Sequence, residues 1–237
     1  MIDFGLKGKK AVVCASSKGL GLACADALAQ TGVNLVMCAR GADVLEASAE
    51  SIRTKTGVEV ITVACDITSE GGRAAVLEAA GHVDILVNNA GGPPPGDFRD
   101  WSRDDWIAAL DANMLTAIEL IKSVLDPMIE NKFGRIVNIT SGSVKSPIST
   151  LGLSNGARAG LTGFIGGLAR QVARHNVTIN GLLPGPFNTD RIENNIKFLA
   201  RQSNQTPEAI RAGMEERNPS GRLGSPKEFG FACAYIC

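Results

Sequence analysis

Short, almost continuously apolar runs alternate with longer amphipathic segments along most of this chain. Strands that are apolar on both faces are typical of parallel sheets covered by helices on each side. Repeated strand–helix units predict right-handed crossovers, and so an α/β fold with a doubly wound parallel sheet. The predicted strands are residues 11–14, 33–38, 58–64, 83–88, 135–140 and 177–183, and the predicted helices are residues 19–30, 42–54, 101–129 and 154–174.

The chain has 237 residues, of which 44% are apolar, and it shows no linker or internal repeat. We therefore expect one domain over residues 1–237. Acidic and basic residues balance at 24 each, which argues against nucleic acid and anionic membranes as partners. No apolar run reaches membrane-spanning length, and the charged start MIDFGLKGKK does not resemble a signal peptide. We expect the cytoplasm by default.

The six cysteines form no CxxC pair, and the chain has only two histidines. This composition argues against a zinc site, and we expect no metal. Cys14 and Cys38 fall inside predicted buried strands, where cysteine acts as a small apolar residue. Disulfides are not expected in the cytoplasm.

Residues 14–21 (CASSKGLG) join the first predicted strand to the first predicted helix. Glycines in such a turn let the backbone bend tightly and approach a pyrophosphate, which the amide groups of the helix start then face. The position between strand and helix favours this reading over an ordinary loop. The predicted phosphate-binding residues are Ser16, Ser17, Lys18, Gly19, Leu20 and Gly21.

The end of the second predicted strand bears on the choice of cofactor. An acidic residue there would hold the adenosine ribose hydroxyls of NAD(H). Here the sequence reads Met37-Cys38-Ala39-Arg40, without an acid. Arg40 and Lys18 could clasp a 2′-phosphate, which favours NADP(H) over NAD(H). The alternative is that both are solvated surface charges.

Further segments add a specific pattern. Residues 84–91 read DILVNNAG, residues 134–141 read GRIVNITS, residues 184–189 read PGPFNT, and Asp66-Ile67 form an acidic–apolar pair. Together with CASSKGLG, they resemble the short-chain dehydrogenase/reductase family, nearest to its 3-oxoacyl-carrier-protein-reductase-like members. The resemblance covers nearly the whole chain, with Ala15 in place of the first glycine of TGxxxGxG. It implies a Rossmann fold and hydride transfer between a nicotinamide cofactor and a carbonyl or alcohol substrate.

The resemblance also implies roles for individual residues. Asn113 stands where the family places a helix asparagine, and Ser141 where it places its catalytic serine. The remaining cofactor contacts that it implies are Asp66, Ile67, Asn89, Ala90, Gly91, Arg158, Pro184, Gly185, Phe187 and Thr189.

The chain departs from the family at its Tyr-x-x-x-Lys pair. Counting thirteen residues on from Ser141 gives Ser154, and four more give Arg158. Serine is a shorter and much weaker acid than tyrosine, so matched general acid catalysis, worth about 10²–10⁴-fold, is lost. Arg158 can still hold the nicotinamide ribose and offer positive charge to an oxyanion. Lys145 could replace the acid, or could be a solvated loop lysine.

The substrate side is less specific. The segment of about 190–218 matches the family's variable lid, and its apolar face is either a substrate wall or a cap on the core. Residues 93–98 and 143–151 would form the other walls, around a ketone or 3-oxoacyl thioester. Gly156, inside a predicted helix, indicates a later helix start or close contact with the cofactor.

Helices 101–131 and 154–174 correspond to the family's usual dimer surfaces, so we expect a homodimer or homotetramer. The family normally continues about twenty residues further, so its last strand is expected to be missing here.

Three functions remain open. In order, they are an NADP(H)-dependent oxidoreductase with an altered acid, a catalytically silent NADP(H)-binding protein, and a non-redox enzyme on the same scaffold.

Overall fold

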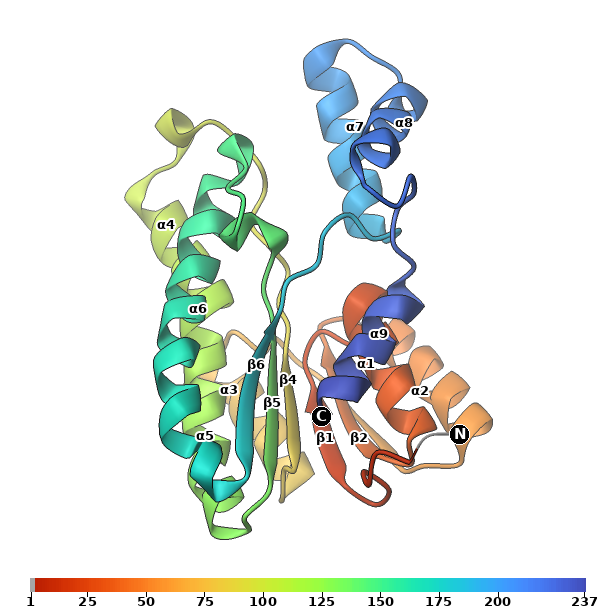
Figure 1. Ribbon diagram of the computed structural model, residues 1–237, viewed down its shortest axis with the longest axis vertical. Helices are drawn as coiled ribbons and strands as arrows, with labels where there is room; N and C mark the ends of the chain where they lie inside the picture. The colour runs from red at the N-terminus through yellow and green to blue at the C-terminus, as the bar shows by residue number, and fades with distance from the viewer. Residues whose placement is uncertain (1–2) are drawn as a thin grey trace.

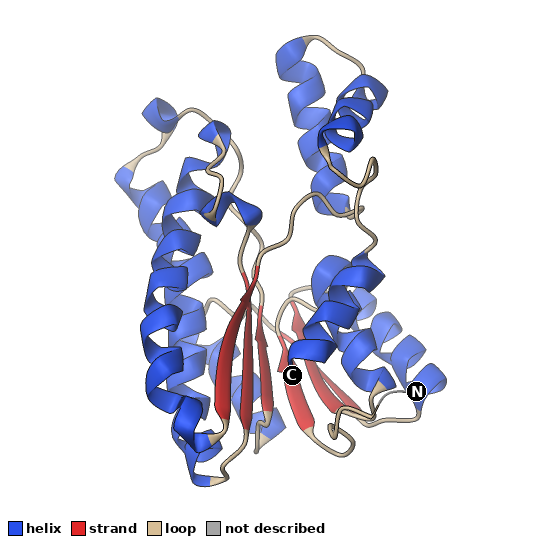
Figure 2. Cartoon of the chain, in the orientation of Figure 1, coloured by secondary structure: helices blue, strands red, loops and turns tan. Residues whose placement is uncertain are grey.

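The computed structural model describes residues 3–237, so the first two residues of the predicted domain and N-terminal segment lie outside it. Six strands form one parallel sheet in the order β3-β2-β1-β4-β5-β6 (Figures 1 and 2). This confirms the predicted doubly wound fold of the Rossmann type. The strands are β1 (Lys10–Val13), β2 (Asn34–Ala39), β3 (Val60–Ala64), β4 (Ile85–Asn88), β5 (Gly134–Ile139) and β6 (Val177–Leu182).

Helices cover both faces of the sheet, and each face has its own buried apolar core. In Figure 1, α1, α2 and α9 lie on one side of the strands and α3, α5 and α6 on the other. Burial on both faces explains the continuous apolar runs of the strands. The helices are α1 (Gly19–Gln30), α2 (Ala42–Thr56), α3 (Glu70–Ala80), α4 (Arg103–Leu110), α5 (Thr116–Glu130), α6 (Gly152–Val172), α7 (Asp190–Ser203), α8 (Pro207–Arg217) and α9 (Pro226–Ile236).

Helix α3 is absent from the sequence-based prediction. Gly71 and Gly72 lower the helix propensity of its first turn. The helix forms because the Ser69 side chain accepts a hydrogen bond from the Gly72 amide at 3.0 Å. A Cβ at position 72 would stand only 2.0 Å from the Asp66 carbonyl oxygen. This glycine therefore permits a close approach between the helix and the loop before it.

The helix predicted over residues 101–129 is not continuous. Helix α4 begins with a capping box between Ser102 and Asp105, and a π-helical turn at Asp111–Leu115 separates it from α5. Such a turn adds a residue to the helix and is frequent at functional sites. Here it contains the buried Asn113.

The expectation that the helix starts later, at Gly156, is wrong. Helix α6 begins at Gly152, earlier than predicted, so Gly156 lies within it. A Cβ on Gly156 would meet the Trp106 ring of α4 at 3.1 Å, and one on Gly152 would meet Trp101 at 2.6 Å. These glycines admit two tryptophan rings against the start of α6.

The strand order reverses between β1 and β4, which are neighbours in the sheet. In doubly wound folds, the crevice beyond the carboxyl ends of the strands at this point is where ligands bind. Helices α7 and α8 stand together beyond this end of the sheet (Figure 1). The fold thus places the loops after β1, β4, β5 and β6 near one another.

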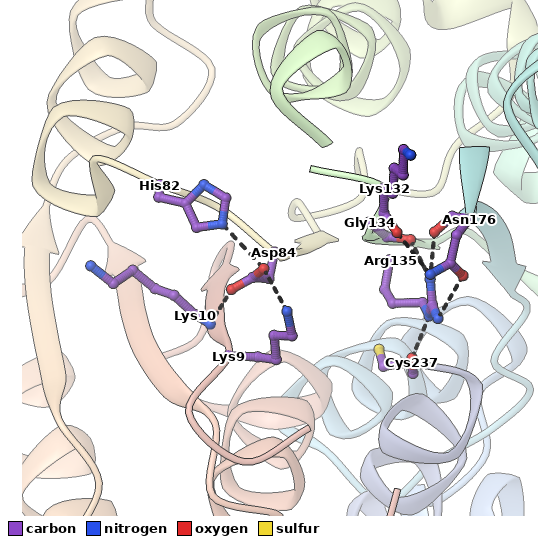
Figure 3. A network of polar contacts seen from close by, with 9 residues as sticks. All are labelled: Lys9, Lys10, His82, Asp84, Lys132, Gly134, Arg135, Asn176 and Cys237. Atoms are coloured by element: carbon purple, nitrogen blue, oxygen red, sulfur yellow. Dashed lines mark hydrogen bonds and ion pairs between the residues drawn. The ribbon is translucent and has the colours of Figure 1, made fainter. Parts of the chain in front are cut away.

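The opposite end of the sheet carries a polar network (Figure 3). Asp84 accepts hydrogen bonds from the Lys10 amide at 3.0 Å and the Lys9 ammonium at 3.3 Å, and it contacts His82 at 3.1 Å. Nearby, Arg135 donates to the carbonyl oxygens of Cys237 and Asn176. These contacts join the starts of β1, β4 and β5 to the end of α9.

Two further properties concern residues 3–237 only. None of the helices there combines the length and apolar character that crossing a bilayer requires. In the same residues, no three His, Cys, Asp or Glu side chains gather as metal ligands would.

Candidate active site

The turn after β1 is held by the neighbouring strand. Ser16 is fully buried, and its amide and hydroxyl both donate to the Cys38 carbonyl oxygen, at 3.0 and 3.4 Å. The Ser17 carbonyl accepts a hydrogen bond from Ser48 of α2 at 2.9 Å. The Ser16 amide and hydroxyl and the Ser17 carbonyl therefore hold the turn against β2 and α2.

The backbone of this turn has the shape that its glycines allow. Gly19 has a φ of +61°, which favours glycine. A Cβ on Gly21 would stand 2.3 Å from the Ala15 carbonyl oxygen and 2.9 Å from Asn89 Nδ2. Ala15 keeps a left-handed φ of +48° although it has a Cβ. A residue with a Cβ in this conformation costs about 1–2 kcal/mol.

The amino end of α1 is open. Lys18 occupies the N-cap position without a capping side-chain hydrogen bond, and the first turn holds no acidic residue. The amides of such an end face an anion favourably. The Lys18 ammonium instead pairs with Asp190 of α7 at 3.0 Å, with both side chains exposed. This pair links the turn to the lid segment.

The adenosine side of the predicted site lies at the ends of β2 and β3. Arg40 is exposed and follows β2 directly. The amide and hydroxyl of Thr68 donate to Asp66 and lower the pKa of that carboxyl, and Arg40 lowers it further. Ile67 beside it is 8% exposed. Arg40 and Asp66 are therefore near enough to interact electrostatically.

The segment after β4 faces the turn after β1. Asn89 Nδ2 donates to the Ala15 carbonyl oxygen at 3.4 Å. The Ala90 carbonyl accepts a long hydrogen bond of 3.4 Å from Arg158, and Gly91 is exposed. Residues predicted from two motifs 74 positions apart are thus in contact.

The segment after β6 lies close to three other segments of the chain. The Pro184 carbonyl accepts from the Gly142 amide at 2.9 Å, next to Ser141. Phe187 pairs with Gly224 and packs edge-on against Phe229, with ring centroids 5.3 Å apart. The Thr189 methyl group would lie 3.9 Å from a Cβ on Gly19. Gly185 sits in the intervening turn.

Ser154 and Arg158 lie one turn apart on α6, and both are buried, at 6% and 8% exposed. Arg158 Nε donates to Ser154 Oγ at 3.2 Å. Its Nη1 donates to the carbonyl oxygens of Ile139 and Thr140, at 2.8 and 3.0 Å. Burial, with Arg191 nearby, lowers the pKa of Arg158 to about 10. The guanidinium thus lies against the end of β5, beside the residue that precedes Ser141.

Asn113 lines a cavity of about 20 Å³ together with Asn89, Thr116 and Arg158. Its Nδ2 donates to the Ala109 carbonyl at 3.3 Å, while its Oδ1 and the Thr116 hydroxyl have no protein partner in the described chain. This volume is enough for about one water molecule, which could bond both atoms.

Two other side chains that carry an acidic proton, Lys145 and Tyr235, are exposed. Lys145 is exposed and makes no side-chain hydrogen bond within residues 3–237, as a solvated loop lysine would. Tyr235, the single tyrosine, is 74% exposed on α9, where its ring packs 6.1 Å from Phe4. Ser141 accepts a hydrogen bond from the Ser143 amide at 3.1 Å and is half-buried.

Arg191 was not among the predicted site residues. From the start of α7, its Nη1 and Nη2 donate to the carbonyl oxygens of Gly92 and Pro93, at 3.1 and 2.8 Å. It thereby joins the lid segment to the loop after β4. The only available signal was a basic residue two positions after Thr189, inside an otherwise acidic first turn.

Comparison with known proteins agrees with this geometry. Residues 9–199 match the family model described as short chain dehydrogenase. The 3-oxoacyl-[acyl-carrier-protein] reductase FabG of Vibrio cholerae is 33% identical to the chain over 237 residues, which cover 98% of this chain and 90% of that protein.

Solved structures are similar over the same length. L-sorbose reductase from Gluconobacter frateurii, complexed with NADPH and L-sorbose, has a TM-score of 0.93 at 29% identity, covering 100% of this chain and 92% of its own. An NAD⁺-bound xylitol dehydrogenase has a TM-score of 0.88 at 26% identity, covering 98% and 92%. With its strand order, its glycine turn and its family match in agreement, this chain belongs to the short-chain dehydrogenase family of oxidoreductases.

Proposed function

We propose that this protein is an NADP(H)-dependent oxidoreductase that interconverts a carbonyl compound, such as a ketone or a 3-oxoacyl thioester, and its alcohol. The observation that carries the proposal is the turn between β1 and α1. It combines a glycine position too tight for any side chain with an uncapped helix end. Both features fit a dinucleotide pyrophosphate lying against bare backbone amides.

Arg40 supports NADP(H) over NAD(H). It is exposed at the end of β2, where the chain has no carboxylate to bind ribose hydroxyls. Lys18 pairs with Asp190, so it can reach a 2′-phosphate only by leaving that partner. We therefore expect Arg40→Ala to weaken NADPH binding about tenfold or more and to leave NADH binding within twofold, because charge-assisted hydrogen bonds are worth about 1.5–3 kcal/mol.

The residues at the end of β5 and on α6 would handle the reacting oxygen. When bound, the reduced nicotinamide supplies a hydride to the carbonyl carbon. Ser141 and Ser154 offer hydroxyl groups that can donate to the carbonyl oxygen. Because Ser154 Oγ accepts from Arg158, its own proton remains available for donation. Arg158 contributes positive charge beside the oxygen as negative charge develops there.

Without tyrosine, the proton that completes the alcohol would come from water, and the two serine hydroxyls would relay it to the oxygen. A serine hydroxyl polarises the oxygen but is a poor acid at neutral pH. We therefore expect a turnover about 10²–10⁴-fold below that of an enzyme with a matched general acid, while the positioning of the hydride is kept.

The decisive assay follows NADPH consumption across ketones, aldehydes and 3-oxoacyl thioesters. The double variant Ser154→Tyr/Arg158→Lys restores the pair of the family, and we expect it to raise kcat at least tenfold with KM for NADPH within threefold. Ser154→Ala is the matched control, and it should not raise kcat. If the double variant folds, binds NADPH and gives no gain, the proposed role of these positions is wrong.

One observation favours a second function, catalytically silent NADP(H) binding. Arg158 is bonded to the carbonyl oxygens of Ile139 and Thr140, as a residue that holds strand ends together would be. Under this alternative, the wild-type protein would bind NADPH without consuming it with any carbonyl compound tested.

A further inference from the structure

Two guanidinium groups from different elements converge on one glycine. Arg158 Nη2 lies 3.6 Å, and Arg191 Nη2 lies 3.2 Å, from the point where a Cβ on Gly92 would stand. Like charges this close repel each other, and no function described above requires both. We infer that Arg158 and Arg191 form a binding site for an oxyanion on the substrate, so that the carbonyl compound this protein reduces bears a carboxylate or phosphate group.

Neither arginine pairs with a carboxylate among residues 3–237. The two acidic residues that flank Arg191 in the first turn of α7 are both engaged elsewhere. Asp190 pairs with Lys18, and Glu193 pairs with Arg211 of α8. The positive charge of the two-arginine site is therefore uncompensated by the protein itself.

The contacts of Arg158 leave one end of its guanidinium weakly bound. Nε and Nη1 make three hydrogen bonds of 2.8 to 3.2 Å. The end that faces Gly92, Nη2, has only the 3.4 Å contact with the Ala90 carbonyl. Because this side chain is held by α6 and β5, its free end has a fixed direction, which is what bidentate recognition of an anion needs.

Arg191 differs in being partly exposed to solvent at the start of α7. Its partners, the Gly92 and Pro93 carbonyl oxygens, are neutral and can be exchanged for a charged acceptor. Burial lowers the pKa of Arg158, and the positive charge of Arg191 lowers it further. Partial burial lowers the pKa of Arg191 as well. A bound anion would remove this cost, since an opposite charge favours the charged form.

The location connects the anion to the reaction. The two-arginine site borders residues 90–93, which follow β4, and it includes Arg158, the residue predicted to hold the nicotinamide ribose. The pyrophosphate of the cofactor already has the amides at the start of α1. The oxyanion is therefore assigned to the substrate, and this assignment rests on the reductase function proposed above. Arginine suits a carboxylate or phosphate because its planar fork matches two oxygens at once.

The test compares matched neutral and anionic ketones with NADPH. The pairs are 4-oxopentanoate with its methyl ester, and dihydroxyacetone phosphate with dihydroxyacetone, which separate carboxylate from phosphate. We expect KM for one anionic member to be at least tenfold below that of its neutral partner. Arg191→Gln should abolish this ratio and leave KM for NADPH within twofold. Arg201→Gln, an exposed arginine at the far end of α7, is the control and should keep the ratio.

Two results would overturn the inference. One is equal KM for anionic and neutral members in both pairs. The other is an Arg191→Gln variant that loses NADPH affinity at least tenfold and keeps the ketone ratio, since the arginine would then serve the cofactor. If no ketone is turned over, calorimetric binding of the same four compounds to the NADP⁺-loaded protein decides. Binding of an anionic member that Arg191→Gln abolishes supports the site while the reductase proposal fails, and no binding refutes both.

Discussion

Arg158 donates a hydrogen bond to Ser154 across 3.2 Å, within one turn of α6. The two residues that depart from the Tyr-x-x-x-Lys pattern therefore contact each other directly and are not independent substitutions. Serine leaves room for the larger guanidinium, whose remaining donors reach the end of β5. The pair has become a buried polar unit, which suggests that both positions contribute to stability as well as to the proposed chemistry.

Removal of the guanidinium should therefore destabilise the fold. Arg158→Ala leaves the Ile139 and Thr140 carbonyls without their donor, and we expect the free energy of unfolding to fall by about 1–3 kcal/mol. Arg158→Lys retains one charged donor group and should lose less. Urea denaturation measures both, and equal stability of Arg158→Ala and wild type would contradict this structural role.

Two adjacent glycines of α3 should respond in opposite directions to alanine. Around Gly71 a Cβ has open space, so Gly71→Ala should stabilise the protein by about 0.5–1 kcal/mol through helix propensity. A Cβ on Gly72 would meet the Asp66 carbonyl at 2.0 Å, so Gly72→Ala should destabilise it by more than 1 kcal/mol. Thermal unfolding of the two variants side by side checks the expectation, and the same sign for both would contradict the described packing.

The Asp84 network predicts a pH dependence (Figure 3). Burial raises the pKa of Asp84, but the Lys10 amide, His82 and Lys9 outweigh it and hold that pKa below its ordinary value. A carboxyl with a lowered pKa in the folded state stabilises the protein above its unfolded pKa of about 4, and this contribution is lost as the pH falls through its folded pKa.

Asp84→Asn should accordingly flatten the loss of stability between pH 5 and pH 2, to be measured by urea denaturation at each pH. Glu78→Gln, which changes an exposed carboxylate in the last turn of α3, is the control and should leave the slope unchanged. If the free energy of unfolding of Asp84→Asn falls with pH as steeply as that of the wild type, the network does not contribute to the acid dependence of stability.

Three exposed apolar side chains bear on the proposed homodimer or homotetramer. Ile107, Leu115 and Phe164 are 48%, 45% and 37% exposed, on α4, the π-helical turn and α6. We expect light scattering at micromolar concentration to give a dimer or tetramer, and Phe164→Glu to reduce the mass. Val44→Glu on α2 is the control, because it lies on the other side of the sheet. A monomeric wild type would contradict the proposal.

The sequence predicted β1, β2 and β4 well because these strands are buried on both faces, so their residues are almost all apolar. The predicted strand 33–38 and the observed β2 (Asn34–Ala39) differ by one residue at each end. Helix α3 was missed because Gly71 and Gly72 lower its helix propensity, and the contact with Asp66 that requires Gly72 has no local signature. The π-helical turn was missed for a related reason, because apolar spacing alone does not reveal one extra residue.

The predicted site residues gather at one end of the sheet because each motif follows a strand, and the parallel strands end at the same edge. Contacts between distant segments could not be predicted. Arg191 meets Gly92 across 99 positions, and Lys18 meets Asp190 across 172. Gly156 was misread because its partner, Trp106, is on another helix. The lid therefore holds the part of the site that sequence alone left undefined.

The central claim, a phosphate cradle between β1 and α1 for a phosphorylated dinucleotide, is tested most directly by calorimetric titration of the wild-type protein with NADPH and with NADH. We predict one binding site per chain and an affinity for NADPH at least tenfold higher than for NADH. Absence of binding heat for both nucleotides, in a protein shown to be folded, would contradict the account.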